Sequence, residues 1–313
     1  MSKCKKTSIG GQALIEGIMM KGPDKTAMAV RLPDGNIDIT YLEDKAPKDI
    51  CPLFALPIIR GVANFVASMV QGYKALMLSA DKSGFTELEE KDGKKKKLPD
   101  WAMAILMFVS GALGVLLAVA LFFALPTLLV DGLEYIFGSL PSVLCIALEQ
   151  ICKLALFVGY GFAVSFMNDI KRVYMYHGAE HKTIFCYEKG LPLTVENIKQ
   201  QRRLHPRCGT SFMILMILVS FLISLTVEIV FPGVNSISWL WMLIKLLLVP
   251  LCCGVGYEVL KFCGRHDNLF TKIVSAPGLW LQRITTKEPD DSMMEIAAAA
   301  LTAVLPKENC DEQ

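Results

Sequence analysis

The sequence predicts a mainly α-helical, multi-pass membrane protein with about four transmembrane helices and a small cytoplasmic β-rich piece at its N-terminus. Two observations carry this prediction. Hydrophobic residues make up 53% of the 313 residues and the mean hydropathy is +0.44, which is more apolar than a soluble domain needs to fill its core. Four apolar stretches are also long enough to cross about 30 Å of hydrocarbon at about 1.5 Å per residue: 101–130, 140–167, 212–231 and 239–260.

The basic residues orient these spans, because the cytoplasmic flanks of membrane helices hold an excess of Lys and Arg. The connections 131–139 and 232–238 contain neither residue. The segment 168–211, the N-terminal hundred residues and the C-terminal tail are rich in both. We therefore expect both termini and segment 168–211 to be cytoplasmic.

Residues 1–53 form the predicted β-rich piece. Two partly alternating stretches, 26–32 and 36–42, flank Pro33-Asp34-Gly35, and this pattern is typical of a hairpin. Before them, four glycines surround Glu16. Such a density of glycine indicates either close approach of the backbone to another group or a bulged pair of strands, and the sequence leaves both open.

The remaining segments follow from helical periodicity and charge. Residues 54–80 carry apolar side chains at helical spacing, which predicts an amphipathic helix that is interfacial or docked on the protein. The charged segment 81–100 is expected to be a solvated linker whose lysines meet anionic lipid headgroups. The four-span membrane domain occupies 101–260, and the cytoplasmic tail 261–313 ends in a short amphipathic helix at 292–305.

Charged residues also fall inside the apolar stretches. Glu149 and Lys153 are one helical turn apart in the second span, and Lys245 lies in the fourth. Because charges in hydrocarbon are costly and usually paired, we expect an intrahelical ion pair between Glu149 and Lys153. A transport pathway is the alternative interpretation.

The central segment 168–211 concentrates residues that bind metals. His177 and His181 are four residues apart, so both imidazoles of a helix would reach one ion. Glu180 lies near the same face and could act as a general base on water. The letters match the H-x-x-E-H pattern of inverted zinc peptidases, although Gly178 weakens the prediction of a stable helix there.

His205 and Cys208 add two further donors to the same segment, and Gly209 allows a sharp turn after them. Two histidines from one helix with a His and a Cys from a second element would close a tetrahedral structural site. Three protein ligands and a water would instead make a catalytic site. Hydrogen bonding of these histidines in a polar loop is the remaining alternative. Other possible donors complete the set: Glu16, Cys186 and Glu258.

Several motifs carry a resemblance to a known family: Gly10-Gly-Gln-Ala-Leu-Ile-Glu-Gly17, Tyr176-His-Gly-Ala-Glu-His-Lys182, Cys186-Tyr-Glu188, Leu204-His-Pro-Arg-Cys-Gly209 and Pro277-Gly-Leu-Trp-Leu-Gln-Arg-Ile-Thr-Thr-Lys-Glu-Pro289. With these motifs the chain resembles the bacterial YqhQ-like family of multi-pass membrane proteins. This is a domain-of-unknown-function family described as predicted metal-dependent enzymes. The resemblance implies a bacterial inner-membrane (cytoplasmic-membrane) protein with a metal-dependent activity.

Together these observations lead to one hypothesis and one alternative. We expect a divalent metal, zinc, at the cytoplasmic face, used to hydrolyse a membrane-proximal substrate. The ligands would be His177, His181 and one of His205, Cys208 or Glu258, with Glu180 as the base. The alternative is a non-catalytic scaffold or transport-related protein whose His/Cys site is a structural staple. The expected partners are the lipid bilayer and this substrate, and we expect no nucleic acid.

Overall fold

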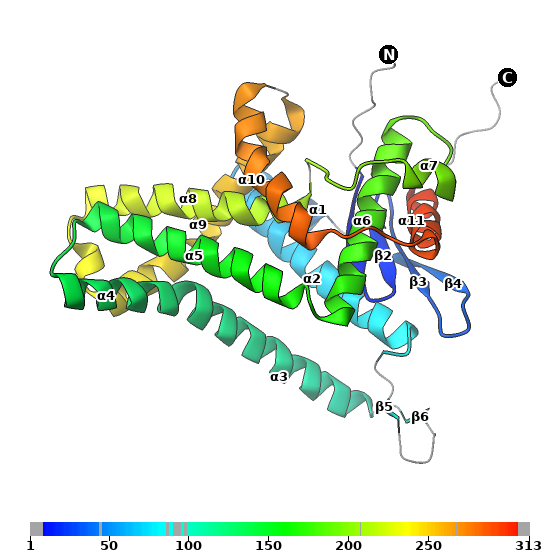
Figure 1. Ribbon diagram of the computed structural model, residues 1–313, viewed down its shortest axis with the longest axis horizontal. Coiled ribbons are helices and arrows are strands. Elements are labelled where there is room, and N and C mark those ends of the chain that lie inside the picture. Colours follow the sequence, from blue (N-terminus) through cyan, green and yellow to red (C-terminus); the bar gives the residue numbers. More distant parts are fainter. Residues whose placement is uncertain are drawn as a thin grey trace.

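The computed structural model describes residues 9–43, 46–85, 88–89, 95–96, 99–206, 208–266 and 268–305. Long apolar helices lie side by side in one half of the molecule, and a sheet flanked by helices forms the other half (Figure 1). The mainly helical class with an N-terminal sheet is therefore confirmed.

The N-terminal sheet is an antiparallel meander. Its four strands pair in sequence order: β1 (Gly10–Leu14), β2 (Gly17–Lys21), β3 (Thr26–Arg31) and β4 (Ile37–Leu42). The predicted hairpin joins β3 to β4, and Gly35 adopts a φ of +88° in its turn. Glycine reaches this left-handed conformation without the strain of a side chain.

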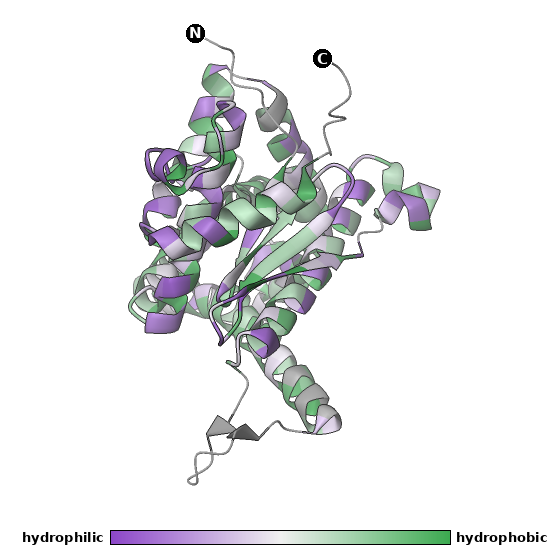
Figure 2. Cartoon of the chain, turned by 90° about the vertical axis from the view of Figure 1, so that its right-hand side faces the viewer, coloured by the Kyte–Doolittle hydropathy of each residue, from purple (hydrophilic) through white to green (hydrophobic). Residues whose placement is uncertain are grey.

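Both faces of the sheet are covered by helices from other parts of the chain. On one face, Ile18, Met20, Ala27 and Ala29 share a core with the C-terminal helix α11 (Asp291–Val304) and with α6 (Asn168–Glu188). Alternate residues of the same strands face a second core completed by helix α2 (Ile59–Lys82). Figure 2 views the molecule from the right-hand side of Figure 1, and there pale and green strands lie among helices that carry many hydrophilic residues.

Helical turns and one long helix form the segment between the sheet and the apolar helices. Two short helical turns, α1 (Pro47–Ile50) and η1 (Pro52–Ala55), lead into α2, and α2 packs on the sheet and on helix α9 (Ser238–Arg265). Two short strands follow, β5 (Leu88–Glu89) and β6 (Lys95–Lys96). Nine of the twenty residues of the predicted charged linker 81–100 lie outside the described residues.

Four helical units are long and apolar enough to cross a membrane. The first combines α3 (Asp100–Val119), a π-helical turn η2 (Ala120–Ala124) and α4 (Leu125–Phe137), and the others are α5 (Ser142–Val164), α8 (Gly209–Val230) and α9. A short 3-10 turn, η3 (Val234–Ser236), precedes α9. The connections 138–141 and 231–237 lie at the end of these helices far from the sheet (Figure 1).

Two expectations about these helices are corrected. The first helix continues to Phe137, where the prediction began a connection at 131, because the helix ends only where Gly138 takes a φ of +87°. Glu149 pairs with Lys245 of α9, at 2.8 Å, and not with Lys153 of its own helix. The pair across two helices places both charged groups inside the protein and away from lipid.

Segment 168–211 is also more ordered than the predicted loop. It contains the long helix α6 and a short helix α7 (Val195–Lys199), and α10 (Leu269–Thr285) follows α9. The expected helix near 292–305 is present as α11. Gly178 does not interrupt α6, because the missing side chain admits a neighbouring backbone: a Cβ there would lie 2.1 Å from the carbonyl oxygen of Lys287.

Candidate metal centre

Three predicted donors come together where α6 meets the beginning of α8. His177 and His181 lie one turn apart on α6, and Cys208 is the N-cap of α8. One donor atom from each of the three lies within 4.8 Å of the others, so this group could hold a metal ion. His181 and Cys208 are buried, and His177 is half-buried.

Backbone carbonyls fix how the two imidazoles face this group. His177 Nδ1 lies 2.8 Å from the carbonyl oxygen of Thr285, and its Nε2 lies 3.1 Å from Cys208 Sγ. His181 Nδ1 lies 2.5 Å from the carbonyl oxygen of Arg203. A carbonyl oxygen can only accept, so each Nδ1 carries the proton and each Nε2 keeps its lone pair. Metal-binding histidines are commonly oriented by the same kind of hydrogen bond.

Burial controls the charge of these donors. Burial lowers the pKa of His181 well below its usual value, and neighbouring His177 lowers it further. Burial also raises the pKa of the Cys208 thiol, although a hydrogen bond from the Thr210 hydroxyl, 3.3 Å away, opposes the rise. A neutral imidazole is the form that offers a lone pair to a cation.

Glu180 lies beside the three donors, and Gly11 of β1 lies directly against its side chain. A Cβ on Gly11 would lie 2.8 Å from the carboxyl carbon of Glu180, so a larger residue in β1 would force the Glu180 side chain to shift. Burial raises the pKa of Glu180 to about 8, while His177 and the backbone N–H of Gly11 act in the opposite direction. One of the predicted glycines therefore does mark a close backbone approach.

His205 borders the centre, with its ring centroid 5.6 Å from that of His181, and the other predicted residues lie elsewhere. His205 is buried against the ring of Phe185, its Nε2 is 3.8 Å from a carboxylate oxygen of Glu188, and burial lowers its pKa to about 4. It does not join the three-donor group. The three possible additional donors contact other parts of the chain. Glu16 binds Arg172 with both carboxylate oxygens, Cys186 lies in the core under the sheet, and Glu258 pairs with Arg60.

Comparison with known proteins places the chain in a family. Residues 56–307 match the model of DUF1385, described as a protein of unknown function. The chain belongs to this family. It is also 36% identical to the uncharacterized protein YqhQ of Bacillus subtilis (strain 168), over 100% of this chain and 97% of that protein. No solved structure matches the chain.

The DUF1385 match covers all three donors and the carbonyls that orient them, but the N-terminal sheet lies before it. That sheet is included in the full-length likeness to the Bacillus protein. Both parts meet at the centre, since Gly11 of β1 contacts Glu180 of α6.

Sequence reasoning missed the C-terminal part of the centre, within 278–289. Gln282 is fully buried: its amide oxygen accepts from the backbone N–H of His205 at 2.7 Å, and its amide nitrogen donates to the His205 carbonyl at 2.8 Å. Lys182 forms an ion pair with Glu288 and also donates to the carbonyl of Lys199. The available signal was the motif Pro277–Pro289 itself, which places a glycine, a glutamine and a glutamate close together.

Proposed function

We propose that this protein is a membrane protein with a divalent metal, zinc, at His177, His181 and Cys208, and that it is a metal-dependent hydrolase of a membrane-proximal substrate. The observation that carries the proposal is the pair of carbonyl-bound Nδ1 atoms, which direct both Nε2 lone pairs to one side, where Cys208 lies.

The chemistry of the donor set fits zinc. Zinc binds imidazole nitrogen and thiolate sulfur, whereas magnesium and calcium prefer oxygen ligands. Among the described residues only three donors meet within reach of one ion, and three protein ligands are typical of a catalytic zinc site with a position left for water or substrate.

Each residue then has a defined part in hydrolysis. A zinc ion held by three protein ligands lowers the pKa of a water molecule and polarises the group under attack. Burial favours the protonated form of Glu180, so its part as general base requires a bound metal, whose positive charge would lower the pKa of the neighbouring carboxyl group. The ionised Glu180 would then accept a proton from water, and Gly11 contacts its side chain. His177 and His181 hold their tautomers through Thr285 and Arg203 and would not need to exchange protons with the substrate.

The outer surface of the long helices supports insertion in a bilayer. Large apolar side chains remain exposed along these units, for example Phe108 at 77% and Leu247 at 70%, and exposed apolar surface on this scale is typical of a membrane or a partner interface. The two connections without Lys or Arg lie at the end far from the centre. The proposal therefore places the sheet, the metal centre and both termini on the cytoplasmic side.

Metal analysis tests the centre. Protein purified in detergent without chelator should hold one zinc per chain, and His177→Ala, His181→Ala and Cys208→Ala should each lose it. His266→Ala is the matched control, because His266 is exposed and outside the three-donor group. If the wild type takes up no stoichiometric zinc, or if the three site variants hold as much as the control, the metal proposal is wrong.

A second comparison separates the enzyme from the structural staple. Glu180→Gln should keep the zinc and lose hydrolysis of lipid and peptide substrates offered to zinc-loaded protein, with products followed by mass spectrometry. A staple would show four protein ligands by X-ray absorption at the zinc edge. If the zinc has four protein ligands and the wild type hydrolyses none of these substrates, the hydrolase proposal is wrong and the site is a structural staple.

A further inference from the structure

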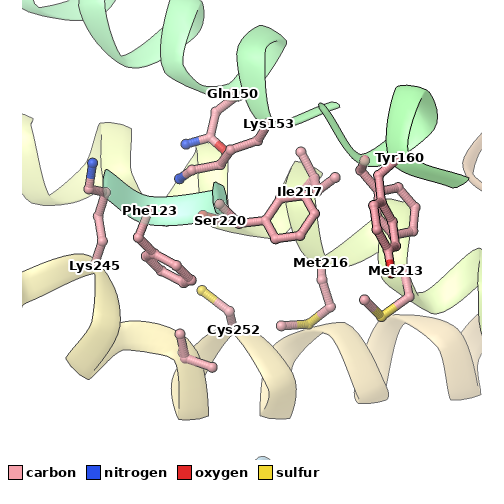
Figure 3. Close-up of a pocket in the computed structure, with 13 residues that line it drawn as sticks. Phe123, Gln150, Lys153, Tyr160, Met213, Met216, Ile217, Ser220, Lys245 and Cys252 are labelled. Atoms are coloured by element: carbon pink, nitrogen blue, oxygen red, sulfur yellow. The ribbon is translucent and has the colours of Figure 1, made fainter. Parts of the chain in front are cut away.

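A second site of interest is a half-open cavity of about 420 Å³ in the bundle of apolar helices, lined by α5, α8, α9 and the π-helical turn η2 (Figure 3). Its size is that of small-molecule sites, which typically span about 300–1,000 Å³. None of its lining residues belongs to the metal centre. The walls are mainly apolar, with Phe123, Phe157, Met213 and Met216 among them.

The cavity carries more positive than negative charge. Lys153 and Lys245 both line it. Lys245 is satisfied, because its Nζ lies 2.8 Å from a carboxylate oxygen of Glu149 and 2.6 Å from the Thr127 hydroxyl. Lys153 is only 6% exposed and lies over the ring of Phe123, and it forms an ion pair with no carboxylate in the described part of the chain.

Gln150 gives independent evidence for a missing polar ligand. It is 6% exposed, and within the described residues neither its amide nitrogen nor its amide oxygen has a hydrogen-bond partner. Figure 3 shows Gln150 and Lys153 projecting from α5 into the space between the helices. Buried polar groups are nearly always hydrogen-bonded, so Gln150 and Lys153, which face one cavity, indicate a polar ligand that binds there.

The position of Lys153 strengthens this argument. It lies near the middle of α5, about as far as possible from either end of that helix. Ionisable groups at such depth are costly and mark functional sites. The adjoining η2 supplies Phe122 and Phe123 to the cavity wall, and single π-helical turns occur frequently at functional sites.

We propose that this cavity binds an amphipathic anion, a carboxylate or phosphate monoester that carries an apolar chain. Its head accepts hydrogen bonds from the Lys153 ammonium and the Gln150 amide. The chain lies along Phe157, Met213 and Met216. A purely hydrophilic ion is disfavoured because this part of the wall is apolar, and a cation is disfavoured by the two lysines. The proposal is independent of the metal centre.

Photolabelling of the purified protein tests the site. A diazirine derivative of dodecanoate, in a non-ionic detergent, should label peptides of α5 and α8. Unlabelled dodecanoate or dodecyl phosphate should compete, and the better competitor shows which head group the site prefers. Lys153→Met keeps the length of the side chain and should weaken labelling about tenfold or more, since a charge-assisted hydrogen bond is lost. Lys171→Met, at an exposed position of α6, is the control and should label like the wild type.

Three results would overturn the proposal. These are equal labelling of Lys153→Met and wild type, equal competition by dodecanol, and stronger competition by dodecylammonium. Thermal unfolding checks that each variant is folded. Should Lys153→Met not fold, Ile217→Phe decides, because it fills the cavity without touching a charge: loss of labelling supports the site and unchanged labelling contradicts it.

Discussion

Gly178 offers a test of the centre that touches none of its donors. In an exposed helix, replacing Gly by Ala gains about 1 kcal/mol, because Ala loses less backbone entropy. Here the new Cβ would lie 2.1 Å from the carbonyl oxygen of Lys287, well inside the 3.0 Å that real Cβ atoms keep from other atoms. The neighbour is backbone, so it cannot move aside as a flexible side chain would.

The clash would push α6 away from the segment that orients His177. The Lys287 N–H donates to the Tyr174 carbonyl at 2.8 Å, and the Thr285 carbonyl accepts from His177 Nδ1 at the same distance. Forced overpacking costs about 1–3 kcal/mol, and a clash with backbone belongs at the upper end of this range, about 2–3 kcal/mol, which exceeds the helical gain of about 1 kcal/mol. We therefore expect Gly178→Ala to lower the free energy of unfolding by about 1–2 kcal/mol. Loss of an orienting hydrogen bond should weaken zinc about 10–100-fold.

The measurements are thermal unfolding in detergent and zinc affinity by competition with a chromogenic chelator. Gly159→Ala is the matched control, since Gly159 lies in helix α5 and a Cβ there would meet nothing within 4 Å. It should be neutral or stabilising and should leave zinc affinity unchanged. If Gly178→Ala is as stable as this control and binds zinc as tightly as the wild type, the close approach does not hold the centre together.

Three further predictions address topology, a buried charge and pH. Single cysteines placed in the two connections at the far end of the apolar helices should react with an impermeant reagent from outside, whereas one at Lys189 should not; the reverse pattern would invert the topology. Lys182 is buried and its partner Glu288 is largely exposed, so Glu288→Ala should lower the free energy of unfolding by about 1–3 kcal/mol, because it leaves the buried charge without its partner. Lys182→Met should cost less. Unfolding in denaturant measures both variants, and the opposite order would contradict this reasoning. A hydrogen bond from Lys82 lowers the pKa of Asp38, so this contact stabilises the fold above the unfolded pKa of about 3.9 and is lost as pH falls through the lower folded value. Lys82→Met should thus cost at most about 1 kcal/mol at neutral pH and nothing in acid, and an equal loss at both pH values would exclude the ion pair as its cause.

The elements with a strong local signal were predictable from sequence. Apolar runs locate the four long helices, with ends that differ from the prediction by up to seven residues, and the Pro33-Asp34-Gly35 turn locates the hairpin of β3 and β4. The connection expected at 131–139 was misplaced because it was recognised by its lack of Lys and Arg, which does not end a helix. Residues 131–137 continue the helix, which ends at Gly138 with a φ of +87°.

What could not be predicted depends on contacts between distant residues. The i, i+4 spacing brings Lys153 next to Glu149, yet Glu149 pairs with Lys245, ninety-six positions further on. His205 and Cys208 are equally plausible donors in the sequence. The amide of Gln282 holds His205 through its backbone and leaves its ring against Phe185, whereas Cys208 begins α8 and reaches His177. Only the packing of the C-terminal segment makes this distinction.

The location of the candidate centre bears on what it does. His177 and His181 belong to α6, which packs on the sheet and α11, whereas Cys208 begins α8, one of the long apolar helices. A metal held by all three would therefore join the sheet unit to the bundle of apolar helices at one point. A staple would explain this position but not Glu180, which is buried beside the donors and lies against Gly11 of β1. Burying the ionisable carboxyl group of Glu180 costs folding free energy, and a role in general base catalysis would explain why it is buried there.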